Sequence, residues 1–344
     1  MSSSRATLMQ VAERAGVSLA STSRALHGTG ASQAMVDRVR AAAKELGYSP
    51  DAIGRSLRMK RTFQVAFAVA DIGNPVYVEM LSAIHEVLAP HGYRVVVMST
   101  GQTAASTADL VRSLGSGFVD GLVVSPLRTD DALVEAIRQA PVPVVVIGRS
   151  LDKQGIDSVS TDSAAGLGQA VEHLLEIGRR RIGFVNGPLD TTPGAARQRG
   201  FDAATSGPGF TGDHAVTERA DDFTVAAGLV AARRLLARDP EAGPFDAVVA
   251  ANDLLAIGVI RAAGELGLSV PHDLAVTGMD DTEIGRVFQP SLTSVSLGSA
   301  DRGRAAAQLV LDRVGDDVGP AQQVAIGPRL FVRESTASKE KNAR

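Results

Sequence analysis

The sequence predicts a small all-α domain of helix-turn-helix type, followed by an α/β core of two tandem parallel-sheet lobes. Three observations support this fold class. Residues 7–46 place apolar side chains at helical spacing in short segments separated by turn residues. From Phe63 onward, short β-branched runs alternate with helical patterns, which is typical of βαβ units. This series restarts near Arg179, which indicates two similar lobes rather than one large sheet.

The run from Thr7 to Leu26 predicts two short helices joined by a tight turn. Thr7 is a good N-cap and Gln10 completes a capping box, while Gly16 can adopt the positive φ of the turn at little cost. Ser18 is expected to cap the second helix. The outward positions of that helix are Leu19, Ala20, Ser21, Ser23 and Arg24. Small and hydroxyl side chains suit close approach to base edges in the DNA major groove, and an arginine suits phosphate or guanine.

A third helix and a hinge are expected next. The third helix covers residues 32–46 and ends at Gly47, and Pro50 prevents its continuation while favouring a new helix start. The following basic segment, residues 51–59, is nearly without an apolar stripe, and isolated helices this short are marginal in water. Gly54 costs on the order of 1 kcal/mol more than alanine in such a helix. The segment is therefore expected to order only on DNA, beside a partner hinge.

These segments, together with ELGYSPDAIGRSLRMKRT at residues 45–62, resemble the LacI/GalR family of bacterial transcription regulators. The resemblance covers nearly the whole chain and implies a periplasmic-binding-protein-like core. It also implies a homodimer, most often a repressor, on a pseudo-palindromic DNA operator, because two-fold protein symmetry requires two half-sites. In the family a hinge leucine wedges between central base steps of the minor groove, and the matching residue is Leu57. The alternative for Leu57 is packing on the core.

The residues expected to bind DNA come from the outward face of the second helix and from the family positions. They are Thr7, Ser18, Leu19, Ala20, Ser21, Ser23, Arg24, His27, Ala52, Arg55, Leu57 and Arg58. Leu19 and Ala20 occupy the two positions that read bases in the family, and neither can form a bidentate hydrogen bond. The resemblance therefore does not extend to a particular operator sequence.

The core is expected to contain two series of strands. The first series is Val65–Ala70, Tyr93–Met98, Gly121–Ser125, Val142–Ile147 and Ile156–Ser160. The second series is Arg181–Asn186, His214–Arg219, Phe245–Ala250 and Leu274–Gly278. Helical patterns between them include Val76–Leu88, Ala164–Ile177, Val225–Leu236 and Leu254–Leu266.

The expected domain boundaries follow from these patterns and the resemblance. They are a helix-turn-helix domain at 1–49, a hinge helix and linker at 50–61, an effector-binding and dimerisation core at 62–338, and a polar tail at 339–344. The last part, Leu292–Val314, is expected to return to the first lobe. The first lobe then covers residues 62–161 and 292–323, and the second covers 162–291 and 324–338.

A ligand cleft is expected between the lobes, because open α/β sheets bind ligands beyond the carboxyl ends of their strands. Carboxylates, an amide, an arginine and aromatic rings at those positions suit a polyhydroxylated metabolite, expected to be a sugar. The effector-binding residues that the resemblance implies are Val76, Tyr77, Arg149, Asp162, Arg197, Phe223, Asn252 and Asp280. Phe223 could instead belong to the core, and Asp162 and Asp253 could cap helices. Gly148 stands where the family often has an acid and Val76 where it often has an aromatic residue, so the metabolite is not implied.

Charge and composition agree with a modular DNA-binding protein. Residues 1–61 carry ten Lys/Arg and four Asp/Glu, a net charge of +6. Because the whole chain has a net charge of −3, residues 62–344 carry −9. The absence of cysteine excludes disulfides, thiolate zinc sites and cysteine nucleophiles. The N-terminal residues lack the apolar stretch of a signal peptide, and later apolar runs are too short to span a bilayer. A cytoplasmic location without membrane contact is expected.

The sequence gives no positive sign of catalysis. The Gly-x-Gly pairs are not completed to a dinucleotide motif, no Walker or Gly-x-Ser-x-Gly motif occurs, and the six histidines are scattered. No catalytic residue, cofactor or metal site is therefore expected, and the core is expected to be a sensor. The alternatives are a metabolic enzyme or an extracytoplasmic-type sugar-binding protein on the same α/β core, neither of which accounts for the basic N-terminal domain.

Replacing Leu57 by alanine tests the wedge. Leu57→Ala should weaken operator binding, because the intercalating side chain is lost, and should leave effector binding unchanged. Titration of operator DNA measures the first effect and calorimetry with the effector measures the second. Equal operator affinity in the variant and the parent protein would refute the wedge.

Overall fold

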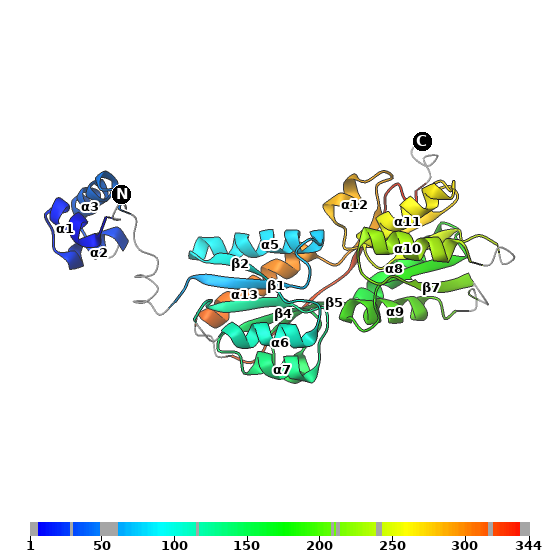
Figure 1. Ribbon diagram of the computed structural model, residues 1–344, viewed down its shortest axis with the longest axis horizontal. Coiled ribbons are helices and arrows are strands. Elements are labelled where there is room, and N and C mark those ends of the chain that lie inside the picture. The colour runs from blue at the N-terminus through cyan, green and yellow to red at the C-terminus, as the bar shows by residue number, and fades with distance from the viewer. Residues whose placement is uncertain are drawn as a thin grey trace. The chain divides into compact units, whose positions relative to one another are not determined.

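In a computed structural model, the chain divides into two compact units, Met1–Thr62 and Phe63–Arg344. The structure describes residues 6–27, 30–48, 61–114, 117–207, 210, 214–238, 243–315 and 319–337. The expected hinge, with Ala52, Arg55, Leu57 and Arg58, lies outside these residues. Figure 1 shows the helices of the first unit and the two α/β lobes of the second.

The described part of the first unit is all-α, as predicted. Its helices are α1 (Leu8–Ala15), α2 (Leu19–His27) and α3 (Gln33–Glu45). The capping box is confirmed, because the Thr7 hydroxyl accepts from the Gln10 backbone N–H and the Gln10 side chain accepts from the Thr7 N–H. Gly16 takes a φ of 64° at the turn between α1 and α2. The buried core is formed by all three helices and comprises Val11, Ala15, Ala25, Val36, Val39, Ala42 and Ala43.

The first lobe is built on a parallel sheet with the strand order β11-β5-β4-β3-β1-β2. Its strands are β1 (Gln64–Val69), β2 (Arg94–Ser99), β3 (Gly121–Ser125), β4 (Val144–Gly148), β5 (Ser158–Thr161) and β11 (Gln323–Ile326). Its helices are α5 (Pro75–Leu88), α6 (Ala104–Ser113), α7 (Asp131–Arg138) and α13 (Ser299–Val314), with short 3-10 turns η1 (Ala89–His91) and η3 (Asp152–Gln154). Side chains of α5 and α13 pack on one face, and side chains of α6 and α7 pack on the other.

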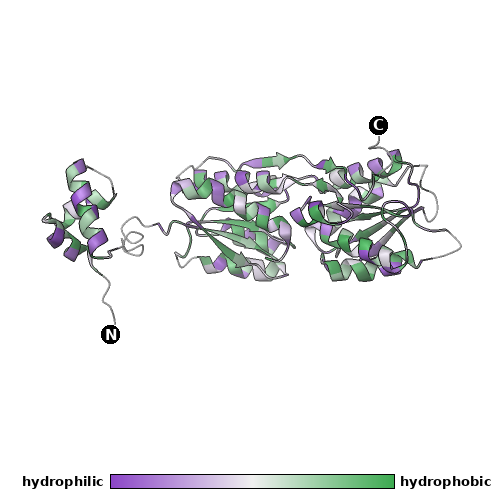
Figure 2. Ribbon diagram, turned by 90° about the horizontal axis from the view of Figure 1, so that it is seen from above, coloured by the Kyte–Doolittle hydropathy of each residue, from purple (hydrophilic) through white to green (hydrophobic). Residues whose placement is uncertain are grey.

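The second lobe has the strand order β12-β10-β9-β8-β6-β7. Its strands are β6 (Ile182–Asn186), β7 (Ala215–Arg219), β8 (Ala247–Ala250), β9 (Ala275–Met279), β10 (Thr293–Ser296) and β12 (Arg329–Phe331). Its helices are α8 (Ser163–Glu176), α9 (Thr192–Ala204), α10 (Val225–Leu236), α11 (Asp253–Glu265) and α12 (Glu283–Val287). Most strands of both sheets are buried on both faces, so Figure 2 shows them as largely hydrophobic ribbons flanked by mixed helices.

Two of the expected lobe assignments are wrong. The return to the first lobe does not begin at Leu292, because β10 pairs in parallel with β9 of the second sheet, and only α13 belongs to the first lobe. Residues from 324 onward do not all belong to the second lobe, because β11 pairs with β5. The second sheet also departs from a wholly parallel arrangement, since β12 runs antiparallel to β10. The chain thus crosses between the lobes after β5, after β10 and after β11.

Close approach of α10 and α11 stabilises the second lobe. A Cβ atom built on Gly258 would lie 2.5 Å from the Leu229 nitrogen and 2.6 Å from the Val225 carbonyl oxygen. Gly264 lies on the same helix, and a Cβ built there would meet nothing within 4 Å.

No helix in the described part of the chain has both the length and the apolar character needed to cross a bilayer.

The two glycines of α11 should therefore respond in opposite ways to alanine. Gly258→Ala should lower the free energy of unfolding by roughly 1–3 kcal/mol, because two helix backbones must separate. Gly264→Ala should leave it unchanged or raise it by up to about 1 kcal/mol, because alanine favours the helix. Urea unfolding of both variants measures the difference. If Gly258→Ala is as stable as Gly264→Ala, the close helix packing is incorrect.

Candidate functional site

The outward face of α2 has the form expected for a DNA-binding helix. Ser18 caps α2, because its hydroxyl accepts from the Ser21 backbone N–H at 3.1 Å. Leu19 is 48% exposed, and Ala20 and Arg24 are also exposed. Ser21 and Ser23 are half-buried, whereas the His27 side chain lies outside the described residues. The structure thus presents the expected short, mostly uncharged face with Arg24 beside it, and Thr7 caps α1.

A cavity of about 650 Å³ lies between the lobes of the core. This volume falls within the range of roughly 300–1,000 Å³ that is typical of small-molecule sites. All eight residues expected at the cleft line it, and they come from both lobes: Val76, Tyr77, Arg149, Asp162, Arg197, Phe223, Asn252 and Asp280. Their positions follow from topology, because they lie at or shortly after the carboxyl ends of strands, or on the helix that follows.

The second lobe contributes a buried ion pair to the cavity. Arg197 of α9 and Asp280, which follows β9, are each 6% exposed, and their nearest charged atoms are 3.4 Å apart. This distance is longer than that of a strong charge-assisted hydrogen bond, so both groups retain bonding capacity. The Arg197 Nε has no hydrogen-bond partner among the described residues. Burial raises the pKa of Asp280, and the positive charges of Arg197 and Arg302 act against this rise.

Asn252 and Phe223 complete this wall. The Asn252 side chain caps α11 by accepting from the Leu255 N–H at 2.9 Å, and it donates to the Phe223 carbonyl at 3.1 Å. The Arg197 guanidinium lies 5.9 Å from the centre of the Phe223 ring. Phe223 packs against the core of the second lobe and also lines the cavity, so core packing does not remove it from the cavity wall. These contacts fix an aromatic face beside hydrogen-bonding groups, as a polyhydroxylated ligand requires.

The first lobe contributes an aromatic ring, and a helix cap lies where the chain crosses from β5 to α8 of the second lobe. Tyr77, in the first turn of α5, packs edge-on against Phe67 with ring centres 6.3 Å apart. Burial raises the pKa of its hydroxyl, although a hydrogen bond with Ser125 opposes this effect. Asp162 caps α8 by accepting from the Ala165 N–H and also faces the cavity, as the sequence allowed. Val76 is buried and Arg149 is half-buried at the cavity wall.

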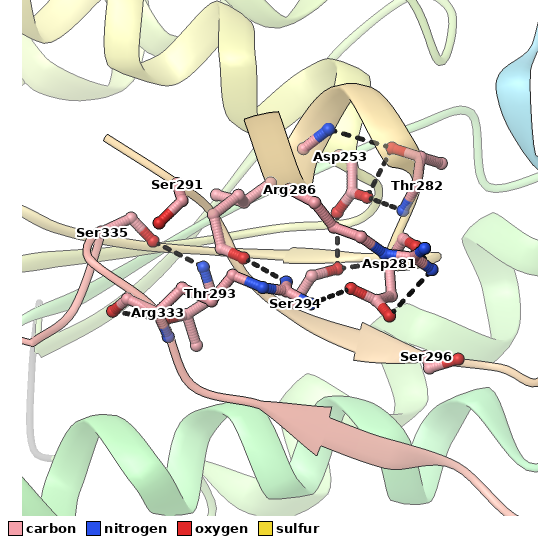
Figure 3. A network of polar contacts seen from close by, with 12 residues as sticks. Asp253, Asp281, Thr282, Arg286, Ser291, Thr293, Ser294, Ser296, Arg333 and Ser335 are labelled. Carbon is pink, nitrogen blue, oxygen red and sulfur yellow. Dashed lines mark hydrogen bonds and ion pairs between the residues drawn. The ribbon is translucent and has the colours of Figure 1, made fainter. Parts of the chain in front are cut away.

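A network of polar contacts surrounds Asp281 and Thr282, which directly follow Asp280 (Figure 3). Asp280 and Asp281 have φ angles of 102° and 52°, which non-glycine residues adopt only where the surroundings enforce them. The Asp253 carboxylate accepts from the Thr282 N–H and hydroxyl at 2.7 and 2.8 Å and from the Ser294 hydroxyl at 2.6 Å. Asp281 in turn pairs with Arg333 at 2.6 Å. The turn is therefore fixed at Thr282 and at Asp281.

The role considered for Asp253 as a helix cap is wrong. Asn252 is the N-cap of α11, and Asp253 lies one residue inside the helix, behind the cavity wall rather than in it. Burial, together with the charge of Asp280, raises the pKa of Asp253 to about 7. Within the described residues, no group of three or more His, Asp or Glu side chains is placed to hold a metal ion.

Several cavity residues were not predicted as effector-binding from the sequence. Arg302 of α13 is the most notable, because it is 6% exposed and lines the cavity. The other polar residues that were not identified as effector-binding are Asn74, Ser125, Ser150, Ser160, Thr161, Ser163, Thr192 and Arg199. Arg302 lies at helical spacing with the buried residues Ser299, Gly303 and Ala306. An arginine within such a row of small buried residues is the sequence pattern that could have predicted a buried functional charge.

Contacts at the rim of the cavity join the lobes directly. Arg128, which follows β3, forms a bidentate pair with Asp190, with N–O distances of 2.7 and 3.1 Å. The Thr192 N–H donates to the Leu127 carbonyl at 2.9 Å. Elsewhere between the lobes, Arg286 of α12 lies 3.2 Å from Glu79 of α5. A change in lobe closure must rearrange these contacts.

The raised pKa of Asp253 predicts a pH-dependent stability. Between its ordinary value of 3.8 and about 7, the folded protein binds a proton that the unfolded chain has lost. The Asp253 contribution should therefore be greatest below about pH 4 and fall, by on the order of 2–4 kcal/mol, as the pH rises to about 7. The check is the difference in unfolding free energy between the parent protein and Asp253→Asn, which cannot titrate there. A difference that is constant over this pH interval would contradict the assignment.

Comparisons with known proteins agree with both units. Residues 7–51 match the family model of "Bacterial regulatory proteins, lacI family", and residues 171–336 match that of a "Periplasmic binding protein-like domain". The HTH-type transcriptional regulator CelR of Thermobifida fusca is 33% identical over 339 residues, covering 96% of this chain and 98% of that protein.

Two solved structures are similar over almost the entire chain. A transcriptional regulator CelR–cellobiose complex is 32% identical with a TM-score of 0.70, and the match covers 96% of this chain and 100% of that one. A lac repressor dimer bound to operator and the anti-inducer ONPF is 25% identical with a TM-score of 0.85, covering 97% and 100%. The helix-turn-helix geometry, the two-lobed core and these matches lead to one conclusion: the chain belongs to the lacI family of bacterial regulatory proteins.

Proposed function

We propose that the chain is a cytoplasmic, homodimeric transcriptional repressor whose operator affinity is set by a small polyhydroxylated metabolite bound between the lobes. The observation that carries this proposal is the cavity itself. It brings Arg197, Asp280 and Asn252 of the second lobe to face Tyr77 of the first, with Asp162 at the crossover between them. Hydrogen-bonding groups beside aromatic rings suit a sugar, and the similar CelR structure is a complex with cellobiose.

The DNA-binding part of the proposal is supported by α2 and by the charge of the N-terminal unit. The exposed face of α2 can enter a major groove, and the basic residues of the first 61 positions can contact phosphates. The lac repressor structure to which this chain is similar is a dimer on its operator, which supports the same assembly here. A two-fold dimer presents two recognition helices to two half-sites of a pseudo-palindrome.

Effector binding would act through closure of the lobes. Because the metabolite contacts both lobes, it favours one closure state, and the hinge segments of the dimer transmit that state to the DNA-binding units. The coupling is reciprocal, so a metabolite that weakens operator binding is itself bound less well on the operator. We further propose that the core is a sensor without catalytic activity, as befits its similarity to transcriptional regulators.

Selection of bound fragments from the source organism's sheared genomic DNA tests this proposal. The full chain should enrich one palindromic site, and a pool of sugars and other metabolites should change that enrichment. Arg197→Ala should enrich the same site without responding to the pool, because a buried hydrogen-bonding group of the cavity is lost. Arg233→Ala, which removes a 53% exposed arginine of α10, should respond like the parent protein.

Two results would contradict the proposal. If no site is enriched with or without the metabolite pool, the DNA-binding function is wrong. If Arg197→Ala responds to the pool as the parent protein does, the cavity is not the site where the metabolite acts.

A further inference from the structure

Arg302 is a second buried arginine of the cavity; it feels the charge of Asp280 but, unlike Arg197, forms no direct ion pair with it. It lies on α13 of the first lobe, is 6% exposed, and lines the cavity that Asp280 and Arg197 line from the second lobe. Its guanidinium forms no ion pair and no hydrogen bond with any described residue, and its buried Nε is unpartnered. A structural arginine in such a position would be expected to bind carboxylates or backbone carbonyls.

The buried charges of the cavity do not balance. Asp280 is the buried carboxylate among the described lining residues, and its single negative charge is shared by two buried guanidinium groups, those of Arg197, at 3.4 Å, and Arg302. Burial lowers the pKa of Arg302, but a guanidinium does not lose its proton in proteins. The other charged lining residues are Arg149, Arg199 and Asp162, which are half-buried or exposed and leave the excess positive.

This excess charge restricts the ligands that the closed cavity can hold. Water can solvate Arg302 while the cavity is empty, but a bound ligand displaces that water. A neutral ligand would then leave two guanidinium groups with only one carboxylate in a dry site, which is strongly unfavourable. An anionic oxygen group would compensate the charge and match the planar fork of the guanidinium.

We propose that the effector is anionic, with a carboxylate or phosphate group that binds Arg302 and with hydroxyl groups that bind Asp280, Asn252 and Arg197. This inference rests on the proposed effector role of the cavity and names the class of ligand. Arg302 binds the anionic group directly, and the hydroxyl-binding groups lie on the opposite lobe. An acidic sugar therefore bridges the lobes by two different chemistries.

Thermal unfolding of the full chain tests the charge imbalance without a known effector. In chloride buffer, Arg302→Met should unfold at a higher temperature than the parent protein, by roughly 2 °C or more, because an unpaired buried cation is removed. Arg304→Met is the matched control. Arg304 lies two residues away on α13, is 49% exposed and forms surface ion pairs with Asp301 and Glu86, so its replacement should leave the unfolding temperature nearly unchanged.

The second arm adds probes at constant ionic strength: inorganic phosphate, D-glucuronate, glucose 6-phosphate and neutral D-glucose. At least one anion should raise the unfolding temperature of the parent protein and of Arg304→Met above the effect of chloride or glucose. Arg302→Met should not show this gain, and by calorimetry it should bind that anion on the order of a hundredfold more weakly. A larger gain in unfolding temperature with glucuronate than with the two phosphate compounds identifies a carboxylate as the anionic group, and the reverse identifies a phosphate.

Three results would overturn the proposal: a lower unfolding temperature for Arg302→Met in chloride, an anion-dependent gain that persists in Arg302→Met, or no gain for the parent protein with any anion. These results are separate from the genomic selection, which tests DNA binding. The genomic selection uses the parent protein, with Arg304→Met as the control, so failure of the anion proposal leaves the regulator proposal standing.

Discussion

The Asp253 carboxylate anchors the turn that presents Asp280 to the cavity. It accepts two hydrogen bonds from Thr282 and one from Ser294, while Arg333 holds Asp281 from the other side. These bonds stabilise the positive φ angles of the turn, which would otherwise cost free energy. Asp253, Asp281, Thr282 and Ser294 are buried, so the position of Asp280 is fixed before any ligand binds, as a preorganised site requires.

The cavity joins two lobes that each carry only half of its chemistry. Asp280 and Arg197 belong to the second lobe, whereas Arg302 and Tyr77 belong to the first. Arg286 links the two halves, because it contacts Asp281 beside the cavity turn and Glu79 on α5. Closure of the lobes and the geometry of the turn are therefore connected through a single side chain. A ligand that contacts both lobes shifts the equilibrium between closure states only by the difference between its binding free energies for those states.

Much of this arrangement could be predicted from sequence, because its signals are local. Thr7, Gln10 and Gly16 specify the first helix and its turn, and strand order places the residues that follow strands at one edge. The lobe assignment of β10 could not be predicted, because it depends on tertiary pairing with β9 and on the bond from the Asp280 N–H to the Val295 carbonyl. Arg302 could not be predicted as a cavity residue for a similar reason. It lies at the cavity because α13 packs beside α5, and this tertiary contact has no local sequence motif.

The most direct test of the account is the operator affinity of a protein whose lobes are covalently linked. The chain has no cysteine, so Arg128→Cys/Asp190→Cys places two unique thiols on opposite lobes, where the native side chains form an ion pair. Linking them with a short bismaleimide should change the operator Kd on the order of tenfold or more relative to the unlinked protein. Each single-cysteine protein, treated in the same way, should bind as before. Equal affinity of the linked and unlinked proteins would contradict control of DNA binding by lobe closure.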